Sequence, residues 1–543
     1  MEASVSGLAT PIVQPESSQD PAAATTSEEE YIGGMRLFAV IASVTLVGFL
    51  MLLDMSIIST AIPEITTDFH SLKDIGWYGA AYNLVGAAFQ PLTGKIYTNF
   101  KAKWTFISFL FFFALGSLVC GVASSSAILI GGRAVAGFGI SGLQNGAMTI
   151  ITNSVPSHKR PALLGVLLGC SQLGIIVGPI MGGAITEYST WRWCFYLNLP
   201  AAAVVACVLI IVPIPERSGR AGRPVAQILV SELDLFGFAL FAPSAVMFLL
   251  GLEFGGRQYP WQSATVVGLL VGSVGMFAVF IAWEHRQGDR AMIPLSMVRK
   301  REVWTSMLAG TFLMGGTVLI FSFYLPVYFQ AVRGVSPLTS GLYVLPNIIT
   351  SIILAVISGV LVTRLRYYVP WVVFGGACAS IASGLFTTLS PSTTTGEWVG
   401  YQILLGARGA ALQMSFVAVQ TVLPEDMISI ATALLVFSQT FGGAIFLTIS
   451  QTVFNHSLGV ELASRLPGQV ADAVMMAGAR GVRDVVSGDD LAVAIQAYSV
   501  AVGHVFYVTL AAGLGIFLSA WGMGWHDISK KTPAGTETEK GEA

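Results

Sequence analysis

The sequence predicts an all-α membrane protein with fourteen transmembrane helices, arranged as two six-helix bundles with two inserted helices between them. The first observation is composition: of the 543 residues, 54% are hydrophobic and 11% are charged. Soluble globular domains carry about 25% charged residues, so this chain has too little charge to solvate a globular surface. The second observation is a succession of apolar segments of roughly 20 residues, the length that crosses the hydrocarbon core of a bilayer. The third is an internal repeat.

The fourteen apolar segments account for most of the chain. Glycine and proline are frequent inside them, which membrane helices tolerate where neighbouring helices satisfy the freed backbone groups. The predicted spans lie near residues 37–61, 75–96, 105–123, 127–152, 162–186, 193–213, 234–254, 263–283, 305–329, 338–363, 370–390, 397–422, 430–455 and 499–525.

The distribution of basic residues predicts the orientation. With the N-terminus placed in the cytosol, 19 of the 28 Lys and Arg residues fall on the cytosolic side, 7 on the far side and 2 within spans. This bias follows the positive-inside rule, so we expect both termini in the cytosol. Residues 1–36, rich in Ser, Thr, Pro and Ala, and residues 528–543 are expected to be cytosolic tails, the first of them disordered. The N-terminal segment has no apolar core of a signal peptide.

The internal repeat predicts the domain organisation. Arg133 in span 4 matches Arg408 in span 12, and the pair Ser171 and Gln172 in span 5 matches Ser438 and Gln439 in span 13, so each span matches one eight later. Parallel repeats of this kind build secondary transporters, with the substrate site between the halves. The predicted regions are an N-terminal bundle at 37–215, a linker region with two inserted spans at 216–304, and a C-terminal bundle at 305–527 with an external loop at about 456–498.

Beside that predicted loop, Asn455, His456 and Ser457 form an N-glycosylation sequon. We expect Asn455 to be glycosylated on the far side of the membrane, with an unused three-residue match as the alternative.

Two ionisable residues in the N-terminal half predict a coupling site. Such a group costs about 2.5–3.5 kcal/mol near the bilayer centre on insertion scales, so it should face the bundle interior or water. Asp54 lies about 10 Å below the outer end of span 1, and Arg133 lies at a matching depth in span 4. We expect the two side chains to meet, and Asp54 to exchange Arg133 for a proton. A static ion pair, or an Asp54 capped by hydroxyls such as Ser56, is the alternative.

Span 5 carries a stripe of glycines at helical spacing. Small residues four apart let helix backbones approach closely, and a proline in the same helix predicts a kink. On physical grounds alone, close packing explains this stripe. Its residues are Gly169, Gly174, Gly178, Pro179, Gly182 and Gly183.

Uncharged amides inside the spans are candidates for lining a substrate cavity. Burying an amide without a partner costs several kcal/mol, so each should face another polar group or water. Contact with substrate and bonding between helices are equally open for them. The candidates are Asn83, Gln90, Gln144, Gln172, Gln413 and Gln439.

Several function classes are excluded. The net charge of −2 gives no reason to expect a nucleic-acid partner. The sequence contains no GxxxxGK[ST] phosphate-binding loop, no HExxH or GxSxG motif and no metal-ligand cluster, so we expect neither an enzyme nor a cofactor. The five cysteines lie in apolar segments without a CxxC pair and are expected to be buried hydrophobes. Because the sequence has no nucleotide-binding loop, uphill transport of a solute would have to draw on an ion gradient.

At these residues the chain resembles the major facilitator superfamily, and within it the fourteen-span drug:proton antiporters, in particular fungal toxin and secondary-metabolite efflux pumps. Residues 53–63, with Asp54 at the acidic position, look like the family's span-1 motif. Residues 133–146 look like its span-4 motif, and residues 169–183 look like its span-5 antiporter motif. The loop after span 2 departs from the pattern, because Thr98 stands at the usual acidic position and Lys101 at the usual second glycine.

The resemblance implies that Arg133 takes part in proton coupling and that the glycine stripe gates alternating access as well as packing. The main hypothesis is a secondary active exporter that exchanges amphipathic organic compounds, such as toxins, secondary metabolites or drugs, for protons. The alternative is proton-coupled uptake or vacuolar loading of siderophores, basic amino acids or polyamines. We expect a monomer in the lipid bilayer of the plasma membrane, with the vacuolar membrane as the alternative.

Overall fold

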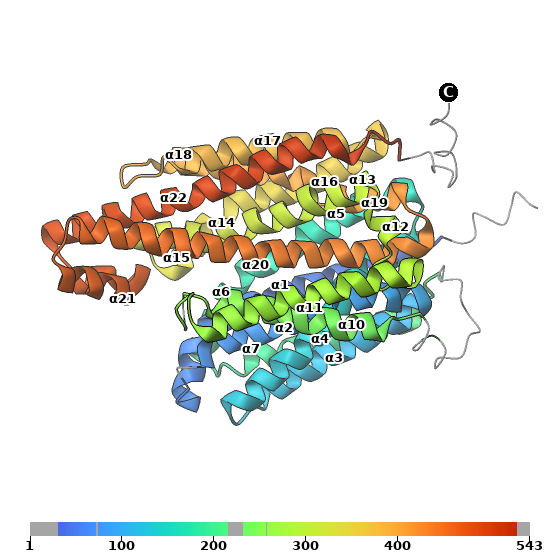
Figure 1. The fold of residues 1–543 in the computed structure, drawn as a ribbon, viewed down its shortest axis with the longest axis horizontal. Helices are drawn as coiled ribbons and strands as arrows, with labels where there is room; N and C mark the ends of the chain where they lie inside the picture. The colour runs from blue at the N-terminus through green and yellow to red at the C-terminus, as the bar shows by residue number, and fades with distance from the viewer. Residues whose placement is uncertain (1–30, 72–73, 216–227, 229–231, 257, 529–543) are drawn as a thin grey trace, which may run out of the picture.

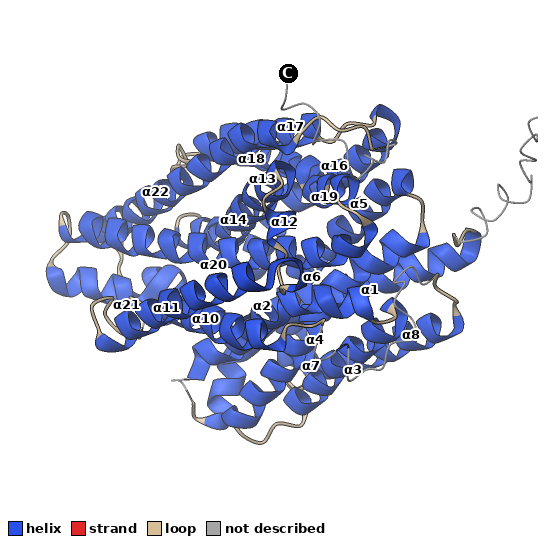
Figure 2. Ribbon diagram, turned by 45° about the vertical axis from the view of Figure 1, so that its right-hand side comes forward, coloured by secondary structure: helices blue, strands red, loops and turns tan. Residues whose placement is uncertain are grey.

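The computed structural model describes residues 31–71, 74–215, 228, 232–256 and 258–528. All regular secondary structure in these segments is helical, and Figure 2 shows helices joined by short connections. The predicted tails lie almost wholly outside the described residues. In Figure 1 the helices run alongside one another in two groups, with most of the N-terminal helices below and the C-terminal helices above. We call the end where α1 begins and α22 finishes the proximal end, and the opposite end the distal end.

The N-terminal bundle contains six spans. Spans 1 to 4 are single helices, whereas span 5 is interrupted once and span 6 begins with a short turn. The helices are α1 (Gly34–Phe69), α2 (Ile75–Asn99), α3 (Ala102–Gly121), α4 (Ser126–Ser154), α5 (Arg160–Ser171), α6 (Leu173–Tyr188), α7 (Trp193–Tyr196) and α8 (Asn198–Ile211).

Two inserted helices follow, α10 (Leu235–Phe254) and α11 (Ala264–Gln287), and then the short α12 (Leu295–Val298). The aromatic face of α10 packs on both bundles: Phe238 lies 4.9 Å from Phe89 of α2, and Phe241 lies 5.1 Å from Phe437 of α20, between ring centroids. The inserted helix α10 therefore covers the seam where α2 meets α20, and α11 packs on α10.

The C-terminal bundle repeats the six-span plan with more interruptions. Span 9 contains a π-helical segment, and span 12 contains a 3₁₀ segment. The elements are α13 (Arg301–Thr305), the π-helix η5 (Ser306–Leu313), α14 (Met314–Ala331), α15 (Pro337–Tyr343), α16 (Leu345–Leu365), α17 (Val369–Phe386), α18 (Thr395–Gly406), the 3₁₀ helix η6 (Ala407–Ala411), α19 (Met414–Val422), α20 (Glu425–Ala463), α21 (Gly468–Val485) and α22 (Gly488–Ala520).

The connection expected as an external loop at about 456–498 is helical. It consists of the distal end of α20, the separate helix α21 and the first turns of α22. The helix α21 is kinked at Gly478, where the backbone is not helical. Val470 and Val474 before the kink and Val482 after it pack into the core at the distal end, whereas Met476 is 90% exposed. This two-sided pattern explains why the segment forms a helix on the bundle rather than an irregular loop.

The number of spans agrees with the prediction. Among the described residues, thirteen helical segments are long and apolar enough to cross a membrane. The predicted second span forms α2, a helix of 25 residues that is not among these thirteen. The helix α2 is less apolar because it carries Asn83, Gln90 and Lys95. It nevertheless packs against neighbouring spans as the others do, in its case against α4 and α20.

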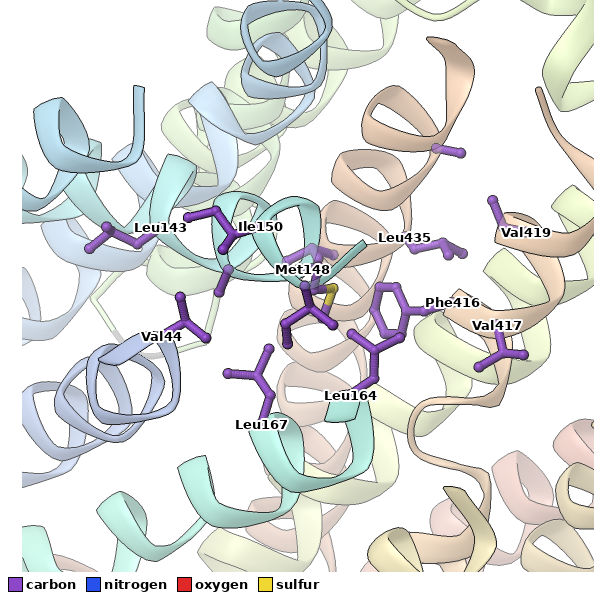
Figure 3. Packing of buried hydrophobic residues seen from close by; sticks show 14 of the residues in the cluster. Val44, Leu143, Met148, Ile150, Leu164, Leu167, Phe416, Val417, Val419 and Leu435 are labelled. Atoms are coloured by element: carbon purple, nitrogen blue, oxygen red, sulfur yellow. The ribbon is translucent and has the colours of Figure 1, made fainter. Parts of the chain in front are cut away.

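The two bundles share one hydrophobic core near the proximal end. Figure 3 shows side chains of α1, α4 and α5 meeting side chains of α19 and α20, for example Met148 and Leu164 beside Phe416. Two glycines allow this close approach: a Cβ at Gly94 of α2 would lie 2.6 Å from the Cα of Ile430, and one at Gly359 of α16 would lie 2.6 Å from the carbonyl oxygen of Pro161. The bundles are therefore closed against each other at the proximal end.

Candidate functional site

Asp54 of α1 and Arg133 of α4 form an ion pair in the interior of the N-terminal bundle. The Nη1 group of Arg133 donates a hydrogen bond to Oδ2 of Asp54. Both side chains are at most 1% exposed, so neither reaches water in this conformation. The structure thus brings together the two residues that the sequence placed at equal depth.

The carboxylate of Asp54 has a second partner on another helix. Nδ2 of Asn198, the first residue of α8, donates to Oδ1 of Asp54 over 2.9 Å and also contacts Oγ of Ser117 on α3 over 3.1 Å. Each oxygen of the carboxylate therefore accepts a hydrogen bond, which an ionised group needs in an apolar interior. Neither Asn198 nor Ser117 was singled out from the sequence, although Asn198 is an amide inside a span like the candidates that were.

The guanidinium of Arg133 is held on its other sides by α2. Its Nε donates to the backbone oxygen of Tyr78 over 2.9 Å, and its plane lies 4.1 Å from the ring centroid of Tyr82. A cation over an aromatic face gains further electrostatic stabilisation when both are shielded from water. These partners depend on the packing of α2 against α4, which no short sequence motif reveals.

The glycine stripe forms the contact between α6 and α1 beside this ion pair. Added Cβ atoms at Gly174, Gly178 and Gly182 would collide with the backbone or hydroxyl groups of α1 between Phe49 and Thr60. Close approach therefore requires glycine at these three positions, which surround the level of Asp54. The contact is consistent with packing and leaves the gating role as a prediction.

The remaining members of the stripe differ. A Cβ at Gly169 would make an ordinary contact of 3.5 Å with Ile352 of α16, and one at Gly183 would meet open space. The helix α6 continues through Pro179, and the interruption of span 5 falls at Gln172, between α5 and α6. Next to that break, Oγ of Ser56 donates to the carbonyl oxygen of Gly174 over 2.9 Å, so a backbone group near the interruption is satisfied.

The six candidate cavity amides fall into two groups. Gln413 and Gln90 are buried, and Nε2 of Gln413 donates to the carbonyl oxygen of Ala355 and to Oγ of Ser358, so this amide joins span 12 to α16. The partly exposed amides are Asn83, Gln144, Gln172 and Gln439. Of these, Asn83 contacts its own helix through the carbonyl oxygen of Gly79 at 3.4 Å. Only the partly exposed group is placed to meet a solute without rearrangement.

In the described segments, no group of three or more His, Cys, Asp or Glu side chains could hold a metal ion. The carboxylate of Asp54 lies in one buried cluster with the guanidinium of Arg133, the amide of Asn198 and the hydroxyl of Ser117. This cluster suits the transfer of a proton or the formation and breakage of an ion pair.

Comparison with known proteins gives the family. Residues 44–447 match the model of the Major Facilitator Superfamily. The chain is 51% identical to the MFS-type transporter pigP of Monascus ruber, over 94% of this chain and 89% of the relative. It is 48% identical to the MFS-type transporter calB of Penicillium decumbens, over 96% and 94%. It is 47% identical to the efflux pump mlcE of Penicillium citrinum, over 96% and 97%.

Solved structures show the same fold at low sequence identity. A double tryptophan mutant of XylE aligns with a TM-score of 0.58 at 14% identity, over 91% of this chain and 97% of that one. The human organic anion transporter MFSD10 aligns with a TM-score of 0.52 at 14% identity, over 88% and 100%. The chain belongs to the Major Facilitator Superfamily and is a multi-pass membrane transporter rather than an enzyme.

Proposed function

We propose that this transporter exports amphipathic organic molecules from the cytosol in exchange for protons, by alternating access between its two bundles. The observation that carries the proposal is the buried Asp54–Arg133 pair, which lies against the glycine contact between α1 and α6. A relative that aligns over 97% of its own length, mlcE, is named an efflux pump, which supports export as the direction.

The coupling step follows from the geometry of the pair. A proton on Asp54 removes the negative charge that Arg133 faces, so the attraction between α1 and α4 weakens. Because α6 touches α1 through Gly174, Gly178 and Gly182, a shift of α1 is transmitted to span 5. The α5 part of span 5 in turn packs on α16 of the other bundle, so the proximal closure responds to the charge of Asp54.

The distal end of α1 offers a place for a proton to arrive. Beyond the apolar part of this helix, burial raises the pKa of the Glu64 carboxyl; the nearby Asp68 raises it further, whereas Arg192 lowers it. A carboxyl group with a raised pKa binds a proton at higher pH than an ordinary one. This end is external if the basic residues set the orientation as expected.

The remaining assignments belong to the same proposal. The termini are cytosolic, the protein acts as a monomer in the plasma membrane, and the closed proximal end is the cytosolic end. The partly exposed amides Asn83, Gln144, Gln172 and Gln439 contact the cargo when the distal side is open. Glycosylation of Asn455, which is exposed on the distal part of α20, stays a prediction.

The proposal is tested by efflux of Nile red, an uncharged amphipathic dye, from yeast cells that express the full chain. Wild-type cells should lose dye faster than cells without the transporter, and dissipating the proton gradient should remove the difference. Asp54→Asn should abolish the gradient-dependent part. Asp472→Asn, a change of the same chemistry at an exposed position of α21, should leave it intact. Proton-coupled efflux that survives in Asp54→Asn would show that the coupling assignment is wrong, and dye accumulation would favour uptake.

A further inference from the structure

The C-terminal bundle contains a buried arginine that the coupling mechanism does not use. Arg408 lies on η6 in span 12 and is 6% exposed, and it matches Arg133 in the internal repeat. Arg133 has a carboxylate, a backbone oxygen and an aromatic ring as partners. The two arginines therefore occupy related positions with different surroundings.

No described group neutralises Arg408. Its Nη1 is buried without a hydrogen-bond partner, and among the described residues Arg408 forms neither an ion pair nor a hydrogen bond. Its one contact of electrostatic character is with the ring of Phe321, whose centroid lies 5.8 Å from the guanidinium carbon. An unpaired charge within a membrane span is costly, and such residues mark ligand or ion sites.

The ring of Phe321 stands where the other half has a carboxylate. Phe321 follows Asp54 by 267 residues, the same offset that separates Ser171 from Ser438. It belongs to α14, the counterpart of α1, and it packs at centroid distances of 5.0 and 4.9 Å against Phe386 and Phe506. The C-terminal bundle has thus kept the cation of the pair and replaced its anionic partner by an aromatic cluster.

The position of Arg408 in the membrane suits a cargo site. It lies 13 residues after the start of α18, which places it about 20 Å along the span from its distal end, near the middle of the bilayer core. The helix is irregular at this point: η6 interrupts α18, and α19 begins only at Met414. In secondary transporters, substrate sites lie near the bilayer midplane at the interface between the repeats and are typically formed by interrupted helices.

We propose that Arg408 binds the carboxylate of an amphipathic organic acid, which is one class of cargo of this transporter. The planar guanidinium matches a carboxylate in a two-pronged hydrogen-bonded arrangement, and a single negative charge neutralises a single arginine. A phosphate monoester with close to two charges would leave one largely uncompensated. The assignment of the organic acid as cargo rests on the proposed export function. The binding test does not depend on that function.

The test measures binding to the purified full-length protein in nanodiscs at neutral pH, with radiolabelled decanoate and with decanol as its uncharged counterpart. Decanoate should bind the wild type more tightly than decanol. Arg408→Gln should weaken decanoate binding about ten- to hundredfold, the loss expected for a hydrogen bond to a charged group, and should leave decanol binding unchanged. Arg408→Lys keeps the charge without the planar fork and should lie between the two. Arg364→Gln, at an exposed arginine of α16, is the matched control.

The proposal is overturned if decanoate and decanol bind the wild type equally, a comparison that needs no variant and no intact mutant fold. It is also overturned if Arg408→Gln weakens both probes alike, because that result would assign Arg408 a purely structural role. Binding requires neither a gradient nor transport, so a negative result here leaves the Nile red experiment unaffected. Failure of Nile red efflux would likewise leave a decanoate site in place.

Discussion

The Asp54–Arg133 pair provides a quantitative prediction, because α1 carries a second ion pair for comparison. Asp54 and Arg133 are at most 1% exposed, whereas Asp68 and Arg192 are 45% and 33% exposed, with 3.4 Å between their charged atoms. Removing one partner of a buried pair leaves an uncompensated charge and costs about 3–5 kcal/mol. An exposed pair contributes about 0.2–1 kcal/mol. Asp54→Ala should therefore lower the free energy of unfolding by at least about 2 kcal/mol more than Asp68→Asn, which removes the charge but keeps an oxygen for the hydrogen bond from Nε1 of the buried Trp191.

A double-mutant cycle isolates the interaction from the other effects of each substitution. The four proteins are the wild type, Asp54→Ala, Arg133→Ala and the double variant, and the measurement is denaturant-induced unfolding in detergent micelles. Because the double variant contains no uncompensated charge, its loss of stability should be smaller than the sum of the two single losses. Asn198 loses its charged partner only where Asp54 is replaced, and Tyr82 only where Arg133 is replaced. Each of these losses occurs once in a single variant and once in the double variant, so both cancel and the cycle reports the ion pair itself.

Two results would refute this reasoning. One is a cost for Asp54→Ala that equals the cost for Asp68→Asn, which would mean that water or another group compensates Arg133. The other is strict additivity in the cycle, which would mean that the two charges do not interact in the folded protein.

Two further predictions concern the packing of the spans. Gly178→Val should destabilise the protein by about 1–3 kcal/mol and slow transport, because the new side chain collides with α1. Gly183→Val places its side chain in open space and should change the melting temperature little. Equal effects of the two substitutions would contradict the role assigned to the glycine contact between α1 and α6. The Thr98 hydroxyl contacts the Asp426 backbone oxygen at 3.3 Å across the proximal closure. Cysteines placed at both positions should be crosslinked by a short bismaleimide, and the crosslink should stop efflux, whereas the reagent should not stop efflux when either cysteine is present alone. Continued efflux in the crosslinked protein would show that the proximal closure does not open.

The sequence predicted the spans well because crossing a bilayer imposes a length and a composition that are local properties of the chain. The position of the Asp54–Arg133 pair followed from two further local facts, the direction of each span and the number of residues from its end. The interior location of the pair follows from the high cost of exposing either group to lipid. No knowledge of the packing was required for these inferences.

Contacts made between helices distant in sequence were not predictable in the same way. Gln413 looks like a cavity amide in the sequence, but it joins span 12 to α16 because a carbonyl oxygen and a hydroxyl of α16 face it. The same limit applies to Asn198, which becomes a partner of Asp54 only when α8 packs on α1. The interruption at Gln172 rather than Pro179 depends on the fit of α5 to α16 and of α6 to α1, which is also a property of the assembled bundles.

The difference between the two arginines has a consequence for the energetics of export. If Asp54 takes up one proton for each organic anion released at Arg408, each cycle moves one positive charge inward and one negative charge outward. Both movements run down a membrane potential that is negative inside, and each elementary charge is worth about 2.3 kcal/mol per 100 mV. An anionic cargo would then be expelled with about 4.6 kcal/mol per 100 mV from the potential alone, whereas an uncharged cargo would receive half of that. With that stoichiometry, an arginine that faces Phe321 where the other half has a carboxylate would form a site at which the membrane potential acts on the cargo.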